Sequence, residues 1–330
     1  MEKIDFVIIW VDGNDKEWQN EKKKYSTSKS EDSRNIRYRD WENLKFIFRG
    51  IEKFAPWVNK VHFITCGHLP KWLNTNYDQI NIVKHSDYIP DKYLPTFSAN
   101  PIELNLHRIE ELSEKFVFFN DDMFLLNKVE EKDFFNNNLP CESAILNATS
   151  PAGNDIMEYV FFNDWNIINR NFDKNTSIKN NFFKWFNFKY GINILRTVAL
   201  MPWTNFLGFK FTHLPTSFLK STFDEIWDKE YDILDKTCEH KFRSKEDVNQ
   251  YLIKDWQISS GKFYPRKYKI GRLFKVSDNI RDITTTIQNQ KYKMICINDD
   301  EIDESNFKIY KKEIIDAFEK ILPEKSKFEI

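Results

Sequence analysis

The chain has few cysteines and no excess of charge of either sign, and each shortage excludes a class of protein. The cysteines show no CxxC or paired Cys/His spacing, which argues against a zinc site or a disulfide framework. We expect free thiols in a reducing cytoplasm. A formal net charge of −1 gives no electrostatic reason to expect nucleic acid as a partner. The four cysteines are Cys66, Cys141, Cys238 and Cys296.

Long apolar runs and flexible, low-complexity segments are also missing. No stretch approaches the roughly 20 apolar residues that a membrane-spanning helix needs. The run Ile4–Val11 is too short and has acidic residues on both sides, so it fits neither a signal peptide nor an anchor. With only 8 Gly and 11 Pro but 30 Phe among 330 residues, the chain predicts a large phenylalanine-rich core. We expect a cytoplasmic protein.

The first 130 residues alternate between strand-like and helix-like patterns. Apolar, β-branched runs predict strands at Ile4–Val11, Lys60–Cys66, Gln79–Lys84 and Phe116–Asp122. Arg39–Phe54 has the apolar spacing of an amphipathic helix. This alternation predicts the α/β class, with a Rossmann-like nucleotide-binding sheet.

The pattern changes at about residue 134 and predicts three parts. Residues 1–133 form the first part of the α/β core, residues 134–210 an inserted, mainly helical subdomain, and residues 211–330 the rest of the core. Further helices are expected at Pro101–Leu112, Phe218–Leu234, Ser244–Ile258 and Ser305–Ile321. Leu322–Ile330 is expected to be a frayed end.

The most informative segment is FVFFNDD, an apolar run that ends in Asn120, Asp121 and Asp122. In open α/β sheets, ligands bind in the crevice beyond the strand ends. Adjacent aspartates repel each other unless a cation or several donors compensate them, and Mg²⁺ holding a phosphorylated ligand would do so. A solvated turn or a helix N-cap is an equally good interpretation of this segment alone.

A second strand end and a pair of arginines also suggest a ligand site. The first strand stops at Asp12 and Gly13, where glycine lets the backbone pass close to a ligand, although Asp-Gly is also an ordinary turn. Arg37 and Arg39 precede a helix and could clamp a phosphate. A solvated surface pair, with Asp40 as the helix N-cap, is the alternative.

Three further polar groups are candidates for acid–base or phosphate chemistry. Glu103 and His107 stand four residues apart, so one helix face could present both to a cleft. His213 ends an apolar run and could act as an acid or base, although a lone histidine is more often structural. Arg243 precedes Ser244, the expected cap of a helix, and could reach a phosphate there. An exposed helical pair and a solvated helix entry are the plainer interpretations.

Taken in order, these segments resemble the Stealth family of sugar-phosphate transferases. The first family block resembles IDFVIIWVDGND, and the second runs from IRYRDWENLKF through LPTFSANPIELNLHRI to FVFFNDDMFL. FTHLPTSFLKSTFDEIW resembles the third block and KFRSKEDVNQYLIKDWQ the fourth. The resemblance covers residues 4–133 and 211–257, and four blocks in the correct order are more specific than any single motif.

The resemblance implies a fold and a reaction. The family includes bacterial capsule and cell-wall polysaccharide phosphotransferases and the catalytic part of N-acetylglucosamine-1-phosphotransferase, so a glycosyltransferase-A-like sheet is expected. Such enzymes transfer hexose-1-phosphate from a nucleotide sugar, usually a UDP-hexose, to an acceptor hydroxyl and release UMP. The acceptor expected here is a polysaccharide or oligosaccharide. Peripheral association with the polysaccharide assembly machinery is compatible with the lack of a membrane span.

The resemblance also implies residue roles. Asp121 and Asp122 would hold Mg²⁺ or Mn²⁺, His213 or Asp122 would remove the acceptor proton, and Arg243 would stabilise the transferring phosphoryl group. Direct in-line displacement is favoured over a phosphohistidine intermediate. Glu103 and Asn120 match further catalytic positions; Asp12, Gly13, Arg37, Arg39 and Asp40 would bind the donor; His107 and Arg108 would support that pocket.

Three alternatives remain open. A metal-dependent glycosyltransferase would release UDP instead of UMP. A non-catalytic sugar-nucleotide-binding assembly factor would bind the donor without turnover. A UDP-sugar hydrolase would turn over at the same rate with and without acceptor. Residues 134–210 match the family poorly, so acceptor specificity is expected to lie there.

Overall fold

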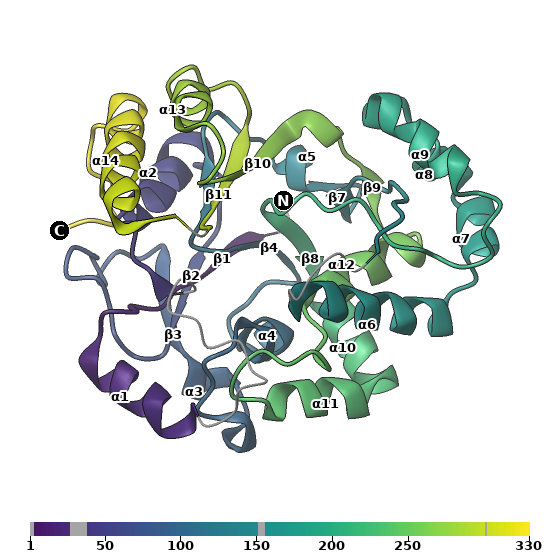
Figure 1. Cartoon of the computed structure of the whole chain (residues 1–330), viewed down its shortest axis with the longest axis horizontal. Helices are drawn as coiled ribbons and strands as arrows, with labels where there is room; N and C mark the ends of the chain where they lie inside the picture. Colours follow the sequence, from purple (N-terminus) through teal and green to yellow (C-terminus); the bar gives the residue numbers. More distant parts are fainter. Residues whose placement is uncertain (1–2, 27–37, 151–155, 301) are drawn as a thin grey trace.

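A five-stranded sheet forms the centre of the protein (Figure 1), which we describe from a computed structural model covering residues 3–26, 38–150, 156–300 and 302–330. Its strand order is β3 (Ile80–Lys84), β2 (Val61–Thr65), β1 (Ile4–Ile9), β4 (Lys115–Phe119) and β8 (Thr216–Leu219). All neighbouring strands run parallel except β8, which pairs antiparallel with β4. The prediction of an α/β, Rossmann-like sheet is confirmed.

The sheet separates two hydrophobic cores. Along β1, Phe6 and Ile8 face one core, whereas Val7 and Ile9 face the other. Helices α2 (Leu44–Phe54) and α14 (Glu304–Ile321) contribute to the first. Because both faces are covered, the central strands are continuously apolar instead of alternating, as buried parallel strands usually are.

The second core is closed by helices of the second half of the chain. These are α10 (Lys220–Lys229), α11 (Tyr231–Glu239) and α12 (Gln250–Ser259), whose apolar residues pack with those of β4. The short helix α4 (Ala99–Leu104) packs against α11 and α12.

A second, smaller sheet positions the region after β4. Its strands are β10 (Gly271–Lys275), β11 (Met294–Asn298) and β5 (Met123–Leu125), and helix α13 (Ile280–Gln288) links β10 to β11. Strand β5 follows Asp122 directly and pairs antiparallel with β11. The end of β11 therefore lies beside the end of β4.

Residues 156–199 form a helical region at one end of the molecule, shown in teal in Figure 1. Helix α6 (Ile156–Asn171) packs on α12. It is followed by α7 (Lys174–Asn180), α8 (Phe182–Trp185), the 3₁₀ turn η4 (Phe188–Asn193) and α9 (Ile194–Ala199). The division at residues 134 and 210 stays a prediction.

The remaining elements are short and peripheral. They are α1 (Lys16–Tyr25), α3 (His85–Tyr88), η2 (Asp91–Tyr93), η3 (Leu106–Arg108), α5 (Glu131–Phe134), η5 (Tyr268–Ile270) and a small sheet of β6 (Phe135–Asn136), β7 (Leu139–Glu142) and β9 (Tyr264–Pro265). Within the described ranges, no helix is both long enough and apolar enough to pass through a bilayer.

Several predicted helix boundaries are wrong for identifiable reasons. The predicted helix at Ser244–Ile258 begins only at Gln250, because the Ser244 amide donates to Asp247 in a turn and Asn249 supplies the N-cap. The predicted helix at Pro101–Leu112 is broken at Asn105. Similarly, Phe218–Leu234 is a strand followed by two helices, the Arg39–Phe54 helix begins at Leu44, and Asp303 caps the last helix.

The C-terminal segment Leu322–Ile330 is held in place, so the prediction of a frayed end is wrong. Phe328 is fully buried against the α2 side of the core. The Ile330 amide donates to the Trp72 carbonyl at 2.9 Å. The Arg49 guanidinium donates to both carboxylate oxygens of Glu329 at 2.8 and 2.9 Å. These contacts fix the tail across α2.

We expect Phe328→Ala to destabilise the protein by about 3–5 kcal/mol, because it removes a buried aromatic ring and leaves a cavity. Ile330→Ala is the matched control, since Ile330 is 69% exposed, and should change stability by less than about 0.5 kcal/mol. Urea unfolding followed by circular dichroism measures both. Equal, small effects of the two substitutions would contradict the docked tail.

Candidate active site

The carboxyl ends of β1 and β4 open into a cavity of about 550 Å³, which falls in the usual size range of small-molecule sites. The residues after β1, Trp10 and Val11, line one part of it, and Asn120, Asp121 and Asp122 after β4 line another. Other segments of the chain contribute Arg39, Asp40, Glu103, His213, Arg243, Asn298, Asp299 and Asp300. The cavity therefore gathers polar groups at the edge where α/β sheets bind ligands.

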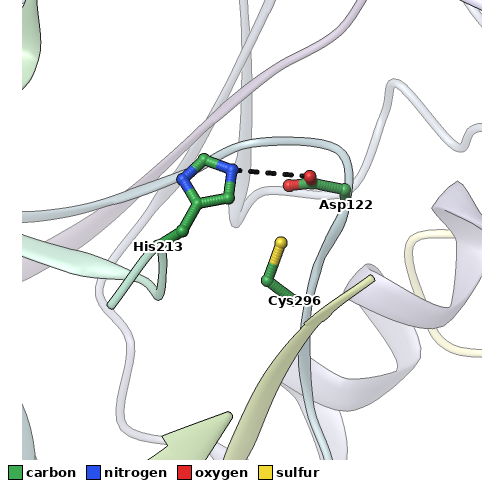
Figure 2. A group of neighbouring side chains, drawn as sticks. All are labelled: Asp122, His213 and Cys296. Atoms are coloured by element: carbon green, nitrogen blue, oxygen red, sulfur yellow. Dashed lines mark ion pairs between the residues drawn. The ribbon is translucent and has the colours of Figure 1, made fainter. Parts of the chain in front are cut away.

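His213 lies between two hydrogen-bonding partners at the edge of this cavity. Its Nε2 is 3.5 Å from Asp122 Oδ2, and its Nδ1 is 2.6 Å from the Tyr251 hydroxyl. Figure 2 shows the imidazole directed at the Asp122 carboxylate, with the Cys296 thiol close to both. The ring also stacks on Phe211, at 5.3 Å between centroids.

The local backbone holds His213 in an unusual conformation. Its φ is 40°, in the left-handed region that residues with a side chain rarely adopt. Such backbone conformations cost free energy and cluster at functional sites. The fold thus fixes this imidazole between Asp122 and Tyr251 at an energetic cost.

The charge of Asp122 decides the proton arrangement. Burial alone would raise the pKa of this carboxyl, but His213 beside it and hydrogen bonds from His213 and Asn298 lower it, so Asp122 is ionised. Nε2 is the ring nitrogen that faces the Asp122 carboxylate, so we assign an N–H to Nε2. For proton transfer the imidazole must carry only this one proton. The Nδ1 lone pair then accepts the Tyr251 hydroxyl proton.

Two other carboxyl groups in the cavity have raised pKa values. Asp121 lines the cavity, where the surrounding protein restricts the hydration of its carboxylate. This desolvation, together with the charge of Asp122, raises the pKa of Asp121 to about 7. Burial raises the pKa of Glu103 to about 7, although Arg243 acts in the opposite direction. Arg243 lies in the loop before Asn249, not at a helix N-terminus as predicted, but it does line the cavity.

The acidic strand end fits a divalent cation. The Oδ1 atom of Asp122 is buried and has no hydrogen-bond partner among the described residues. Asp121 and Asp122 also repel each other, and oxygen donors such as carboxylates are the ligands that Mg²⁺ and Mn²⁺ prefer.

Asp122 also belongs to a group of three possible metal ligands. Ligand atoms of Asp122, His213 and Cys296 lie within 4.8 Å of one another, a set of oxygen, nitrogen and sulfur that would also suit zinc. Sequence spacing could not reveal this group, because the three residues are far apart in the chain. Burial and the charge of Asp122 raise the pKa of the Cys296 thiol, so it stays protonated without a metal.

Arg39 and Asp40 line the cavity, but not in the predicted way. The Arg39 guanidinium donates to both oxygens of Asp299, at 2.9 and 2.7 Å, and is therefore already engaged. Asp40 does not cap α2, whose N-cap is Asn43; its carboxylate accepts the Glu42 amide instead. The prediction for Arg37 lies outside the described residues.

Asp12 and Gly13 follow the cavity-lining Val11 but do not line the cavity themselves, so their role in donor binding stays a prediction. The Asp12 carboxylate accepts the Asn14 amide at 2.9 Å and so stabilises the turn after β1. A Cβ atom at Gly13 would lie 1.9 Å from the Tyr38 carbonyl oxygen. Gly13 is needed because the backbone before Arg39 passes directly over it.

His107 and Arg108 are also away from the cavity, because α4 ends before them and the expected shared face with Glu103 does not form. His107 stacks on Phe223 of α10, at 5.7 Å between centroids. Arg108 donates to the Asn105 side chain at 2.9 Å and lies over Trp227. Neither residue lines the cavity, and their support of the donor pocket stays a prediction.

Sequence reasoning missed several residues of the site. Tyr251 lies in the segment KFRSKEDVNQYLIKDWQ, but nothing in its spacing singles it out. Asn298, Asp299 and Asp300 end the run MICINDD, which repeats the pattern of FVFFNDD and could have identified them. Such a pattern marks a second acidic strand end, and the pairing of β11 with β5 brings it to the first.

A smaller cavity of about 130 Å³ adjoins the large one. Phe161, Phe211 and Tyr251 line both cavities, so they form the boundary between them. Lys254 and Asp255, both buried, add charged groups to the smaller cavity. The Asp255 carboxylate accepts the Trp165 indole N–H at 3.1 Å, and burial raises the pKa of Asp255 to about 7.

Comparison with known proteins agrees with this geometry. The models of Stealth conserved region 1 and conserved region 2 match residues 2–30 and 37–142. The chain is 46% identical to the capsular polysaccharide phosphotransferase WcwK of Streptococcus pneumoniae, covering 100% of this chain and 98% of that protein. It is 41% identical to the receptor polysaccharide phosphotransferase WefC of Streptococcus gordonii, over the full length of both. It is 36% identical to the exopolysaccharide phosphotransferase cps2G of Lactiplantibacillus plantarum, covering 99% and 96%.

These matches define the protein as a phosphotransferase enzyme. The chain belongs to the Stealth family, as its first two sequence blocks predict. Solved structures with similar folds are distant: the glycosyltransferase GlyE of Streptococcus pneumoniae has a TM-score of 0.39 at 8% identity, covering 98% of this chain and 62% of that one. The bifunctional glycosyltransferase WbbM has a TM-score of 0.40 at 10% identity, covering 97% and 52%.

The raised pKa of Asp255 predicts a pH dependence of stability. Between about pH 4 and pH 7 the folded protein keeps a proton on Asp255 that the unfolded chain has lost, so this group makes stability fall as pH rises. Asp255→Asn removes this pH-dependent loss of stability. The melting temperature of the variant minus that of the native protein should therefore increase by roughly 2–4 °C between pH 5 and pH 8. Exposed Asp316→Asn is the control, and a parallel profile for both variants would contradict the assignment.

Proposed function

We propose that this protein transfers hexose-1-phosphate from a UDP-hexose to a hydroxyl of a bacterial capsule or cell-wall polysaccharide and releases UMP. The observation that carries the proposal is the chain of contacts Asp122–His213–Tyr251, which lies where the large and the small cavity meet. The names of full-length relatives support a polysaccharide as the acceptor.

The large cavity has the size and position for the donor. A nucleotide diphosphate carries negative charge that fixed donors and cations must balance. Arg243 lines this cavity and acts electrostatically on the carboxyl of Glu103, and it would contact the phosphoryl group being transferred. Trp10, Tyr38 and Trp41 line the same cavity and offer aromatic surface to the base or the sugar.

Tyr251 and His213, with Asp122 behind them, can together remove the acceptor proton. The acceptor oxygen would attack the β-phosphorus of the donor, and the bond from that phosphorus to the UMP oxygen would break. The hydroxyl proton would pass to Tyr251 while the phenol gives its own proton to His213 Nδ1. The Asp122 carboxylate would then stabilise the imidazolium through Nε2. Hexose-1-phosphate keeps its anomeric oxygen throughout.

Asp121 and Asp122 would hold a divalent cation, with the unpartnered Oδ1 of Asp122 as one ligand. When bound, Mg²⁺ or Mn²⁺ would neutralise charge on the pyrophosphate. The other oxygen of Asp122 remains on the His213 side, so the same carboxylate can position the imidazole. Asn120 and Glu103 would add hydrogen bonds from the cavity wall.

The smaller cavity is suited to one sugar of the acceptor. Phe161 and Phe211 provide aromatic faces against which a pyranose ring can pack, and Asp255 and Lys254 provide hydrogen-bonding groups. Tyr251 borders this cavity, so a hydroxyl of a sugar bound there would face the phenol. The residues that line the smaller cavity lie outside the two matched family regions, residues 2–30 and 37–142.

We expect His213→Ala and Asp122→Asn each to lower turnover by ~10²–10³, because each removes a group that stabilises charge in the transition state. Asp316→Asn is the matched control, since it changes an exposed carboxyl that does not line the cavity. Release of UMP from UDP-hexose in the presence of acceptor measures all three. Near-native turnover of the first two variants would contradict the site.

Removal of divalent cations should abolish transfer. Treatment with EDTA followed by dialysis is expected to reduce activity to background, and added Mg²⁺ or Mn²⁺ should restore it. The same protocol applied with Zn²⁺ tests the mixed donor group of Asp122, His213 and Cys296. Full activity in EDTA would remove the cation from the proposal.

Phosphorus NMR of the protein with Mg²⁺, a panel of UDP-hexoses and a glycan acceptor tests the reaction itself. A new phosphodiester resonance with stoichiometric UMP is the expected result. UDP without a new phosphorus linkage would identify a glycosyltransferase instead. Equal turnover with and without acceptor would identify a hydrolase. Binding of a donor without turnover of any donor would identify a binding protein.

A further inference from the structure

The helical region exposes an unusual concentration of apolar side chains. Half of the large apolar side chains that the described residues expose come from residues 182–203. Phe183, Phe188 and Ile192 are 83%, 84% and 80% exposed, far more than single surface residues usually are. We call the seven side chains of Phe182, Phe183, Phe188, Ile192, Leu195, Val198 and Trp203 the apolar patch.

The apolar patch belongs to adjacent elements. Its residues lie on or next to α8, η4 and α9, and η4 packs against α9. In Figure 1, α8 and α9 are both at one end of the molecule, far from α14 at the other. The patch is thus a local surface and not a scatter of separate side chains.

The chain around the patch carries positive charge only. Residues 174–223 contain no Asp or Glu but seven Lys or Arg: Lys174, Lys179, Lys184, Lys189, Arg196, Lys210 and Lys220. Residues 256–277 contain no Asp or Glu either, and include Lys267 and Lys269. The chain as a whole has a net charge of −1, whereas these two stretches have a net positive charge because they lack acidic residues.

The two acid-free stretches form one surface. The η5 turn, with Lys269, packs against η4. Lys184 donates to the Gly261 carbonyl at 2.6 Å and Lys189 to the Pro265 carbonyl at 2.9 Å, which joins the stretches. Some basic residues of the second stretch pair with carboxylates, as Lys262 does with Glu225. Among the described residues, no such pair involves Lys179, Arg196, Lys267 or Lys269.

From this combination we propose that the apolar patch and the surrounding cations bind the surface of an anionic phospholipid bilayer. Aromatic and aliphatic side chains that project from short helices can enter the headgroup region, while lysines and arginines contact lipid phosphates. Two weak contributions of this kind together give stable but reversible binding.

The positive charge decides between a membrane and a second copy of this chain. A symmetric contact would place the cations of both copies next to each other, which costs free energy unless carboxylates compensate them. The acid-free sequences around the patch offer no such carboxylates. An anionic lipid surface supplies the opposite charge over the whole face.

The apolar patch is connected to the smaller cavity, which is the proposed acceptor site. The Arg196 side chain donates to Asn147 at 2.6 Å, and Asn147 lines the smaller cavity. A bilayer against the patch would therefore lie on the same side of the molecule as that cavity. An acceptor attached to a membrane lipid would reach it without leaving the surface.

Vesicle sedimentation with the full chain tests the proposal. We expect the protein to pellet with vesicles of phosphatidylglycerol and phosphatidylcholine at low salt, and at least tenfold less with phosphatidylcholine alone or in 1 M NaCl. Phe183→Ser/Phe188→Ser should weaken binding at least tenfold. Lys179→Gln/Lys267→Gln/Lys269→Gln should weaken it roughly fivefold for each charge removed.

Matched controls come from the other end of the molecule. Ile309→Ser on α14 replaces an apolar side chain that is 53% exposed, and Lys23→Gln/Lys24→Gln/Lys312→Gln removes three exposed charges from α1 and α14. Both should bind like the native protein, and circular dichroism confirms that each variant is folded. The assay contains neither donor nor acceptor, so its result is independent of the proposed transfer reaction.

Two outcomes would overturn the proposal. The first is no pelleting with anionic vesicles, or equal pelleting of the native protein and the patch variant. The second is a dimer in analytical ultracentrifugation that Phe183→Ser/Phe188→Ser dissociates while neither protein binds vesicles. That second outcome would make the patch a contact between two copies.

Discussion

The site depends on one partly buried carboxylate, that of Asp122, and on the contacts that lower its pKa. Its backbone carbonyl accepts the Ile297 amide at 2.9 Å, which fixes the end of β4 against the end of β11. One side-chain oxygen faces His213 and Asn298, and the other has no partner among the described residues. Removing the partners of a partly buried charge costs free energy, so the contact between the ends of β4 and β11 and the position of His213 have to be kept together.

The two faces of the sheet have different tasks. The face covered by α2 and α14 carries the core that the C-terminal tail closes through Phe328 and Arg49. The other face supports α10 and α12, and α12 presents Tyr251 to His213. Stability and chemistry are thus separated across the sheet, while β4 serves both because its residues alternate between the two cores.

Sequence patterns predicted the strands well and the helix starts poorly. A buried parallel strand is a continuous apolar run, so the bounds of β1, β2, β3 and β4 were predicted to within three residues. A helix start depends on which polar side chain caps it. Ser244 and Asn249 are both suitable caps, and only the turn through Asp247 selects Asn249.

By itself the sequence determined the α/β class, the family and eight residues that line one cavity, because local patterns and the order of blocks encode them. These residues are Arg39, Asp40, Glu103, Asn120, Asp121, Asp122, His213 and Arg243. Only the tertiary structure decided that Asp12, His107 and Arg108 lie outside this cavity and that Tyr251 and Asn298 line it. It also decided that Cys296 lies beside Asp122. These positions depend on where α4 ends and on the pairing of β5 with β11, which are contacts between distant segments. The apolar patch could also be found only from the tertiary structure, because the exposure of a side chain depends on how the chain packs and not on the residue type alone.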